Sequence, residues 1–259
     1  KKEYQELINY AKEIDIIFFS TPFDFKSVDF LSSLEMPVYK IASADLINTP
    51  LQKEIAKTGK IIFLSTGGGS LDDVKRAYDT IMPINTNLSI LHCTASYPVE
   101  AEDMNLNCIN TLIEEFPKTI IGLSDHENGI DAASVAYMLG ARIFEKHFTL
   151  NRAWKGTDQS FSLEPEGLKK LVRNLKRIPK FLGSDTKKLL ENEKKPLFKM
   201  QKSIVTSRAL KKGHVISYDD LAFKSPGSGL KPYQYDLVLN KKILKELKED
   251  DLILLEDLE

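Results

Sequence analysis

The sequence has few of the features that mark secreted, membrane-spanning or nucleic-acid-binding proteins. It holds 2 cysteines in 259 residues, too few for a fold built on disulfides, so we expect a reducing, cytoplasmic setting. Its 36 Lys and Arg residues nearly balance 37 Asp and Glu residues, which gives no long-range field for capturing nucleic acid or a membrane surface. No apolar run approaches the roughly 20 residues of a membrane span. With 42% hydrophobic residues, the chain is expected to be globular.

What the chain does contain is a repeated unit of one short apolar run followed by a helix-like stretch. Six such runs begin at residues 15, 38, 60, 88, 119 and 142, with successive starts 22 to 31 residues apart. This spacing accommodates a strand, two short loops and a helix, and predicts a parallel sheet. Because the runs are apolar throughout, both faces of the sheet should be covered, as in a βα barrel or a doubly wound sheet. The gaps predict helices over 26–35, 48–58, 70–81, 105–116, 129–139 and 164–182.

The composition changes after residue 183. Residues 184–200 are rich in Lys and Glu and lack a clear apolar period, which is typical of a linker. Residues 201–259 hold short apolar runs and the turn-rich stretch SPGSG. The sequence therefore predicts an α/β domain over 1–183, a linker over 184–200 and a small mixed module over 201–259.

Polar side chains stand at the carboxyl end of every predicted strand. That edge carries the active site in parallel α/β folds, so we expect these side chains to form one site. One hydroxyl there would be ordinary helix capping, but all six runs end this way. The residues are Ser20, Thr21, Ser43, Ser65, Thr66, Thr94, Ser124, Asp125, His126 and His147.

His126 and His147 end consecutive predicted strands, which brings two imidazoles side by side at the strand spacing of about 4.8 Å. A single histidine at such a place is more often packed in a core, but two could share one metal ion. Neither belongs to a helical HExxH or Cys-rich pattern, so a closed structural zinc site is not expected. Two imidazoles with open positions suit a catalytic Mn²⁺ or Mg²⁺ ion. His92 and His214 are interpreted as structural.

Lys40 lies inside an apolar run, where its ammonium must find an anion or lose its proton. It could form a Schiff base, as in class I aldolases, or hold a phosphate together with nearby hydroxyls. The glycines at 67–69 match neither GxxxxGK[ST] nor GxGxxG and are interpreted as a chain turn. The phosphate interpretation is favoured by the ring of hydroxyls expected around the lysine from Thr21, Ser43, Ser65 and Ser124.

Eight short motifs follow one another over residues 15–183: STPFD, YKIAS, LSTGG, LHCTASYP, EDMNL, GLSDH, EKHFTL and GTDQSFSLEP. In this order they resemble the sialic acid synthase family, also called N-acetylneuraminate synthases. The tail KKGHVISYDDLAFKSPGSGL is similar to that family's SAF, or antifreeze-like, domain. The resemblance implies a (β/α)8 TIM barrel followed by a small mixed α/β, β-clip-like SAF domain. It also implies condensation of phosphoenolpyruvate with an N-acetylmannosamine-type sugar, or its 6-phosphate, to a nonulosonic acid and inorganic phosphate.

Carried over position by position, the resemblance implies roles for the residues above. His126 and His147 match metal-binding histidines, whose divalent ion activates the sugar aldehyde for attack by C3 of phosphoenolpyruvate. These histidines and Lys40 are the implied catalytic residues. The positions that bind phosphoenolpyruvate are matched by Thr21, Lys40, Ser43, Ser65 and Ser124. The positions that line the sugar site are matched by Asp45, Tyr97 and Asp158.

The family pattern further implies a domain-swapped homodimer in which each SAF module covers the partner's active site. The chain departs from that pattern in four places. By this resemblance, we expect that the barrel's first two βα units, which would precede the strand at residue 15, are not part of this sequence. Ala95 and Gln159 stand where Asn and His are common, and Ser225 stands at the expected SAF arginine, with Lys224 as a substitute donor.

Two other interpretations stay open at this point. One is a Schiff-base aldolase acting through Lys40, which borohydride trapping with pyruvate would reveal. The other is a carbohydrate-binding relic that no longer catalyses, although such a relic would have no reason to keep the hydroxyl ring and the histidine pair. The acceptor also stays open, among N-acetylmannosamine, its 6-phosphate and a deoxy-diacetamido sugar.

Overall fold

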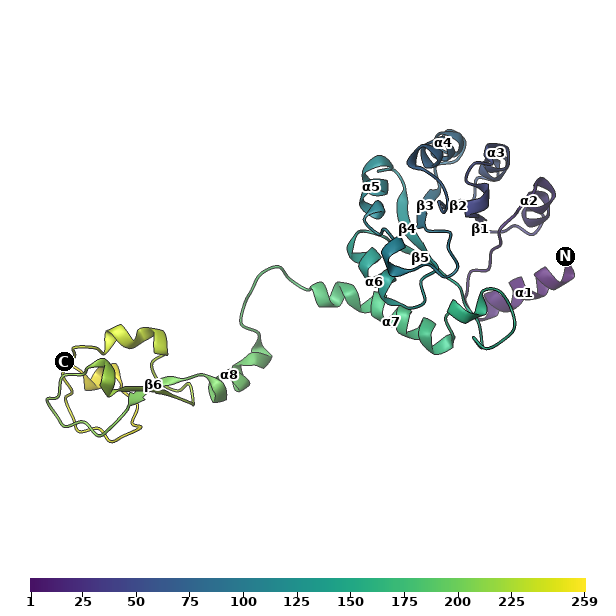
Figure 1. The fold of residues 1–259 in the computed structure, drawn as a ribbon. Coiled ribbons are helices and arrows are strands. Elements are labelled where there is room, and N and C mark those ends of the chain that lie inside the picture. The colour runs from purple at the N-terminus through teal and green to yellow at the C-terminus, as the bar shows by residue number, and fades with distance from the viewer. The chain divides into compact units, whose positions relative to one another are not determined.

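The computed structural model describes residues 1–259. The chain divides into two units, Lys1–Gly183 and Ser184–Glu259 (Figure 1). Neither unit contains a helix that could cross a membrane, given the length and hydropathy of its helices.

Five of the six predicted strands form one parallel sheet in the order β1-β2-β3-β4-β5. Each strand pairs with the next one along the chain, without the reversal of order that defines a doubly wound sheet, so the sheet has the order of a barrel wall. The strands are β1 (Val38–Ile41), β2 (Ile61–Ser65), β3 (Leu88–Cys93), β4 (Ile120–Asp125) and β5 (Ile143–Lys146).

The first predicted strand, at 15–20, does not form. Only Ser20 makes a bridge, to Tyr39 of β1. Asp15 adopts a left-handed backbone conformation, with φ of 56°, and the amide of Ile16 donates to the carbonyl of Ala11. The start of the run is therefore tied to the end of the preceding helix, and only its last residue reaches the sheet.

The predicted helices are present, and α3 to α6 connect consecutive strands. Three of them begin at side chains that accept hydrogen bonds from first-turn amides: Asp24, Asn48 and Ser70. The helices of this unit are α1 (Lys2–Glu13), α2 (Phe25–Ser32), α3 (Thr49–Lys57), α4 (Leu71–Ile81), α5 (Cys108–Glu115), α6 (Asp131–Met138) and α7 (Pro165–Leu182).

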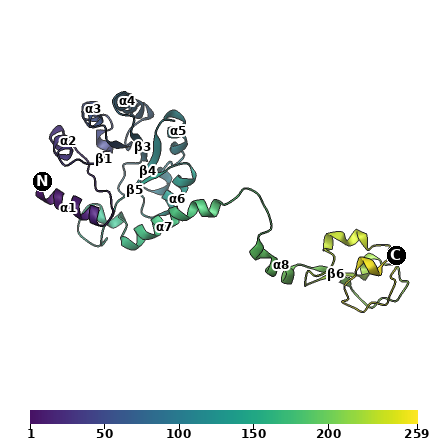
Figure 2. The same ribbon diagram turned by 180° about the vertical axis from the view of Figure 1, so that it is seen from behind.

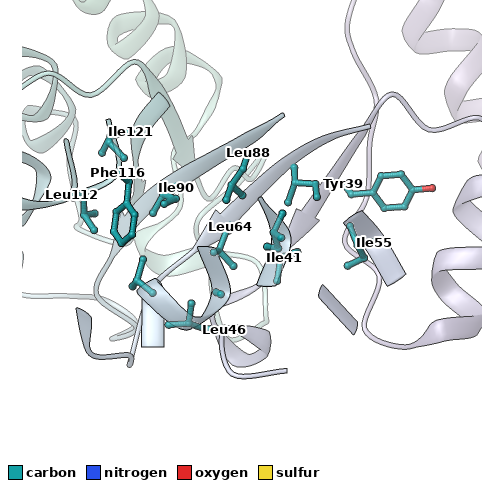
Figure 3. Packing of buried hydrophobic residues seen from close by; sticks show 14 of the residues in the cluster. Tyr39, Ile41, Leu46, Ile55, Leu64, Leu88, Ile90, Leu112, Phe116 and Ile121 are labelled. Atoms are coloured by element: carbon teal, nitrogen blue, oxygen red, sulfur yellow. The ribbon is translucent and has the colours of Figure 1, made fainter. Parts of the chain in front are cut away.

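Alternation along the strands separates an apolar face from a polar one. The helices form an arc outside the strands in both views (Figures 1 and 2). The main core packs apolar strand residues such as Ile41, Leu64 and Ile90 with the helices (Figure 3). The residues between them point to the other face. That inner face carries the polar side chains Lys40, Ser65, Ser89, Ser124 and Glu145.

The second unit, Ser184–Glu259, is small and mixed. Its segment 184–200, predicted as a linker, is largely exposed and ends in the short helix α8 (Lys194–Met200). Beyond it, β6 (Ser203–Thr206) and β7 (Leu221–Lys224) pair antiparallel. Isolated bridges and 3-10 turns complete the unit around a core of its own, in which Ile204, Val238 and Ile253 are fully buried.

Candidate active site

Lys40 stands on the inner face of β1 and is 7% exposed. Its Nζ lies 3.6 Å from Glu145 Oε1 of β5 and donates to the carbonyl of Ile41 at 3.1 Å. Because β1 and β5 are the two outermost strands, this contact shows that the sheet curls. Burial lowers the pKa of Lys40, and the Glu145 carboxylate opposes that shift.

Glu145 is the site residue that the sequence analysis missed. In addition to its contact with Lys40, it accepts a hydrogen bond from Ser65 Oγ at 3.4 Å. A signal was available, because Glu145 lies two residues before His147 and must therefore share its face of the strand. An acidic residue in a short apolar strand needs a partner, and Lys40 was a lysine already predicted to lie inside a strand at the same site.

Ser43 follows β1 and is joined to the glycine loop after β2. The amide of Gly67 donates to Ser43 Oγ at 3.0 Å, and a Cβ at Gly67 would lie 2.8 Å from that oxygen. Gly67 therefore permits a close approach, whereas Gly68, with φ of 73°, provides the turn that the sequence indicated. The glycine loop thus belongs to the site, which the sequence analysis did not expect.

The two remaining hydroxyls of the predicted ring differ in their surroundings. Ser124 is 4% exposed at the end of β4, opposite its register partner Cys93. Thr21 follows the bridge residue Ser20 beside β1, and its hydroxyl makes no hydrogen bond within the protein. The structure therefore brings Ser43, Ser65 and Ser124 to one edge of the sheet, with Thr21 at its margin.

His126 and His147 directly follow β4 and β5, and their ring centroids are 5.1 Å apart. His126 Nδ1 lies 3.0 Å from the carbonyl oxygen of Thr94. Because a carbonyl can only accept, Nδ1 carries the proton and Nε2 keeps its lone pair. His147 Nδ1 faces Asp158 Oδ2 at 3.6 Å. Both rings therefore have an oxygen on the Nδ1 side, which leaves Nε2 available to a ligand.

This donor set fits a divalent ion with open coordination positions. Nowhere in the chain do three or more His, Cys, Asp or Glu side chains converge as a closed metal site. A metal-ligating histidine usually donates its other ring N–H to a carbonyl or carboxylate, which is the environment of both imidazoles. Two such ligands leave positions for water and for substrate oxygens.

The two imidazoles differ in basicity. Burial acts to lower the pKa of His126, but hydrogen bonds with Cys93 and Thr94 outweigh it and raise the pKa above its ordinary value. Burial and the neighbouring His126 lower the pKa of His147.

An aromatic wall stands beside the histidines. The Tyr97 ring lies 4.2 Å from that of His126, and the Phe161 ring lies 5.1 Å from that of His147. Tyr97 is 52% exposed, so its hydroxyl can meet a ligand. Asp45, by contrast, accepts from Asn48 Nδ2 at 2.9 Å and forms no hydrogen bond or ion pair with the other candidates. The structure thus brings Tyr97 and Asp158 to the histidines, but not Asp45.

A cavity of 440 Å³ opens between Ser43 and Tyr97. Its volume lies within the usual range for small-molecule sites, about 300–1,000 Å³. The lining is completed by Ala44, Leu46, Ile47, Gly67, Gly68, Gly69 and Ala95. Hydroxyls, a lysine, two imidazoles and a cavity therefore share the carboxyl edge of one curled sheet.

Comparison with known proteins identifies the family. Residues 1–187 match the NeuB family, and residues 201–259 match the SAF domain. The chain belongs to the NeuB family. Its curled parallel sheet with outer helices is the α/β part of that family's fold, and the SAF domain follows it.

Several relatives of this NeuB-family chain are similar over nearly all of its length. It is 40% identical to an uncharacterized protein of Methanocaldococcus jannaschii, with 100% of this chain and 77% of that protein covered. It is 39% identical to the N,N'-diacetyllegionaminic acid synthase of Campylobacter jejuni, with 97% and 76% covered. It is 38% identical to the N-acetylneuraminate-9-phosphate synthase of Homo sapiens, with 97% and 70% covered.

Solved structures give the same result. The spore coat polysaccharide biosynthesis protein SpsE of Bacillus subtilis matches with a TM-score of 0.66 at 32% identity, over 98% of this chain and 76% of that one. The sialic acid synthetase of Leptospira borgpetersenii, in complex with citrate, matches with a TM-score of 0.69 at 35% identity, over 76% and 68%. The family thus includes proteins named as synthases of several related sugar acids.

Proposed function

We propose that the protein condenses phosphoenolpyruvate with an N-acetylmannosamine-type sugar, or its 6-phosphate, and with one water, which adds to C2 as the C–O bond to phosphate breaks, to give a nonulosonic acid and inorganic phosphate. The observation that carries this proposal is the presence, at one sheet edge, of a buried lysine among hydroxyls and of two imidazoles with free Nε2 atoms. A phosphate-bearing enol and an aldehyde sugar need these two kinds of group side by side. The names of the Campylobacter and human relatives support the same reaction class.

Lys40 and the serines form the phosphate-binding end of the proposed site. The Lys40 ammonium supplies positive charge, and Ser43, Ser65 and Ser124 supply hydroxyl donors. As the C–O bond to phosphate breaks, negative charge grows on the departing group, and these donors stabilise it. Glu145 favours the charged form of Lys40 against the effect of burial. The role proposed for Lys40 is therefore that of an anion-binding ammonium rather than a neutral amine.

The histidines form the aldehyde-binding end. His126 and His147 would hold a divalent ion, Mn²⁺ or Mg²⁺, which when bound polarises the sugar aldehyde as a Lewis acid. Thr94 and Asp158 orient the two rings through their Nδ1 sides. Tyr97 packs on the His126 ring and limits water there, while its exposed edge can meet the sugar.

A Schiff-base aldolase is the second candidate, because burial lowers the pKa of Lys40. Its ammonium, however, lies near Glu145 and donates to a carbonyl, which favours the charged form. Borohydride treatment with pyruvate separates the two mechanisms. A stable adduct on Lys40 would support the aldolase and contradict the condensation through a divalent ion.

We also propose that in the whole protein the sheet is part of an eight-stranded barrel and that the protein is a domain-swapped homodimer. The relatives are longer than this chain, and Ile16 and Ile17, in the segment that leads to the Ser20 bridge with β1, are 60% and 70% exposed, as a surface that receives further strands would be. Lys224, the substitute for the SAF arginine, pairs with Asp250 and must leave that pair to reach a partner's sugar. Light scattering on the full-length protein should give twice the monomer mass; a monomeric mass contradicts the dimer.

Phosphate release from phosphoenolpyruvate tests the function. The full-length protein is assayed with Mn²⁺ and with N-acetylmannosamine, its 6-phosphate, a diacetamido-trideoxy sugar or no acceptor, each with and without chelator. Release that requires an acceptor and stops with chelator is expected, and the preferred acceptor identifies the product. Release with none of the sugars would contradict the proposal.

A further inference from the structure

An ion pair is buried in the layer between the sheet and the helices, where the neighbouring strand residues are apolar. Asp125 and Lys146 are the last residues of β4 and β5 and are register partners. Their side chains are 3% and 4% exposed, and Lys146 Nζ lies 2.9 Å from Asp125 Oδ2. Two residues earlier on each strand, Leu123 and Phe144 pack in the apolar core. Apolar residues at these two places would often be at least as stabilising, so stability alone does not explain the pair.

The pair holds the backbone on the far side of His126. The amide of Glu127 donates to Asp125 Oδ1 at 2.8 Å, and Lys146 Nζ donates to the carbonyl of the same Glu127. The carbonyl of His126 itself accepts from the amide of Val99 at 3.2 Å. The peptide group that joins His126 to Glu127 and the one that follows Glu127 are therefore both tied, and Asp125 and Lys146 make two of the three ties.

The same two residues directly precede the two histidines. Asp125 precedes His126 and Lys146 precedes His147, and successive side chains of a strand point to opposite faces. The ion pair thus links the ends of β4 and β5 from the helix side, while the imidazoles project from the inner side. A shift of either strand end would change the 5.1 Å separation of the two rings.

We propose that Asp125 and Lys146 are positioning residues that set the separation and direction of His126 and His147, and through them the affinity for a divalent ion. The inference rests on the proposed function, since the ion belongs to it. Neither residue needs to touch substrate or ion, because both act through the backbone of the strand ends and of Glu127. On this proposal, the role of the ion pair is to place the two imidazoles and not to stabilise the fold.

Mn²⁺ binding without substrates tests the proposal. The free Mn²⁺ signal is followed by electron paramagnetic resonance during titration of the full chain, of Asp125→Asn and of Lys146→Met. Loss of a residue that orients a metal ligand typically weakens metal binding roughly 10- to 100-fold, and we expect that range for both variants. Unchanged Mn²⁺ affinity in both variants would overturn the proposal.

A double variant separates positioning from folding. In Asp125→Leu/Lys146→Met, apolar side chains replace the pair in an apolar layer, so the melting temperature should return close to that of the wild type. Glu127 stays untied, however, so Mn²⁺ affinity should remain weakened. Recovery of affinity together with stability would show a purely structural role and overturn the proposal.

A control at the other edge of the same sheet measures the effect of destabilisation alone. Asn85 is 5% exposed, and its Nδ2 donates to the carbonyl of Lys60, just ahead of β2, at 2.7 Å. Asn85→Ala should lower the melting temperature and leave Mn²⁺ affinity unchanged. If the wild type itself binds no Mn²⁺, the metal site of the proposed function fails along with the positioning role. If the wild type binds Mn²⁺ and the Asp125 and Lys146 variants bind it with the same affinity, the positioning role fails and the metal site of the proposed function stands.

Discussion

At the scale of single residues, the site side chains are held by contacts that lie outside the apolar core. His126 is fixed by the Thr94 carbonyl, the Tyr97 ring and, at 3.9 Å, the Cys93 sulfur. His126 is 5% exposed, but none of these three partners belongs to the main apolar core. Substitutions of such residues should therefore lower turnover much more than they lower the free energy of unfolding.

His126→Ala in the full-length protein should abolish turnover and change the free energy of unfolding by about 1 kcal/mol or less, because an open metal site is not a folding nucleus. Phosphate release and thermal melting measure the two effects. His92 is the matched control: it is 8% exposed, and its Nε2 bonds to the carbonyl of Met104 at 2.7 Å. His92→Ala should keep turnover and lose about 1–3 kcal/mol of stability. Turnover near wild type in His126→Ala would reject the metal assignment.

Lys40→Met should weaken phosphoenolpyruvate binding about 10-fold or more and sugar binding much less, because it removes a charged hydrogen-bond donor from the phosphate end only. Steady-state kinetics with each substrate varied in turn give both values. Lys57→Met, which removes an exposed lysine paired with Glu54 on α3, should change neither. Equal loss for both substrates would point instead to misfolding of the buried strand.

At the scale of elements, the loops after the strands decide how the hydroxyls are presented. The glycine loop after β2 reaches across to the turn after β1, where the amide of Gly67 binds Ser43. A Cβ at Gly67 would also meet Ala95 and Cys93, each at 2.9 Å. Three loop or strand ends therefore converge on a space that admits only a hydrogen atom.

Gly67→Ala should displace Ser43 and raise the KM for phosphoenolpyruvate several-fold, because the added Cβ meets the Ser43 hydroxyl at 2.8 Å. Gly68→Ala is the control, since a Cβ there meets nothing within 4 Å while φ is 73°. That change should cost about 1–2 kcal/mol through backbone strain and raise KM less than Gly67→Ala does, because it does not press on Ser43. The same KM in wild type and Gly67→Ala would contradict the role given to the loop.

At the scale of the whole molecule, the chain has two units with separate cores, and the SAF unit has its own buried charge. The Asp220 side chain is fully buried and accepts from Arg208 Nη2 at 2.7 Å, His214 Nε2 at 2.7 Å and the Ser217 amide at 2.9 Å. Burial acts to raise the pKa of Asp220, but these hydrogen bonds outweigh it and hold the pKa well below its ordinary value. Because His214 is hydrogen-bonded to the buried Asp220, we interpret it as a structural histidine, as in the sequence analysis.

The lowered pKa of Asp220 predicts acid sensitivity of the SAF unit. A depressed carboxyl pKa stabilises the folded state fully above the unfolded value, about 3.9, and the gain is lost as pH falls toward the folded value. Hydrogen exchange by mass spectrometry should therefore show residues 201–259 opening more readily below about pH 4. Asp220→Asn should cost about 1.5–3 kcal/mol at neutral pH and flatten this pH dependence, whereas the exposed Asp219→Asn should do neither. An unchanged pH profile in Asp220→Asn would contradict the assignment.

Local signals in the sequence determined the helices, five of the strands and the edge at which the polar residues gather. Helix periodicity and caps such as Ser70 act within a few residues, so they can be read without knowing the fold. The carboxyl ends of parallel strands meet at one edge, so Ser43, Ser65 and His126 could be predicted to lie near one another. The prediction of a strand at 15–20 was wrong. Apolar residues mark a segment locally, whereas a strand forms only where a partner strand lies along its whole length.

Only the tertiary structure decided the strand order, the part of Glu145 in the site and the ion pair of Asp125 with Lys146. Ser65 and Glu145 are 80 positions apart and meet only because the sheet curls. In the sequence, Asp125 is one of several polar residues at strand ends. Only the strand register shows that Lys146 lies opposite it. Contacts of this kind depend on the curvature and register of several strands together, and no local pattern encodes either. The sequence by itself determined which groups reach the edge, and the packed sheet decided which of them face each other.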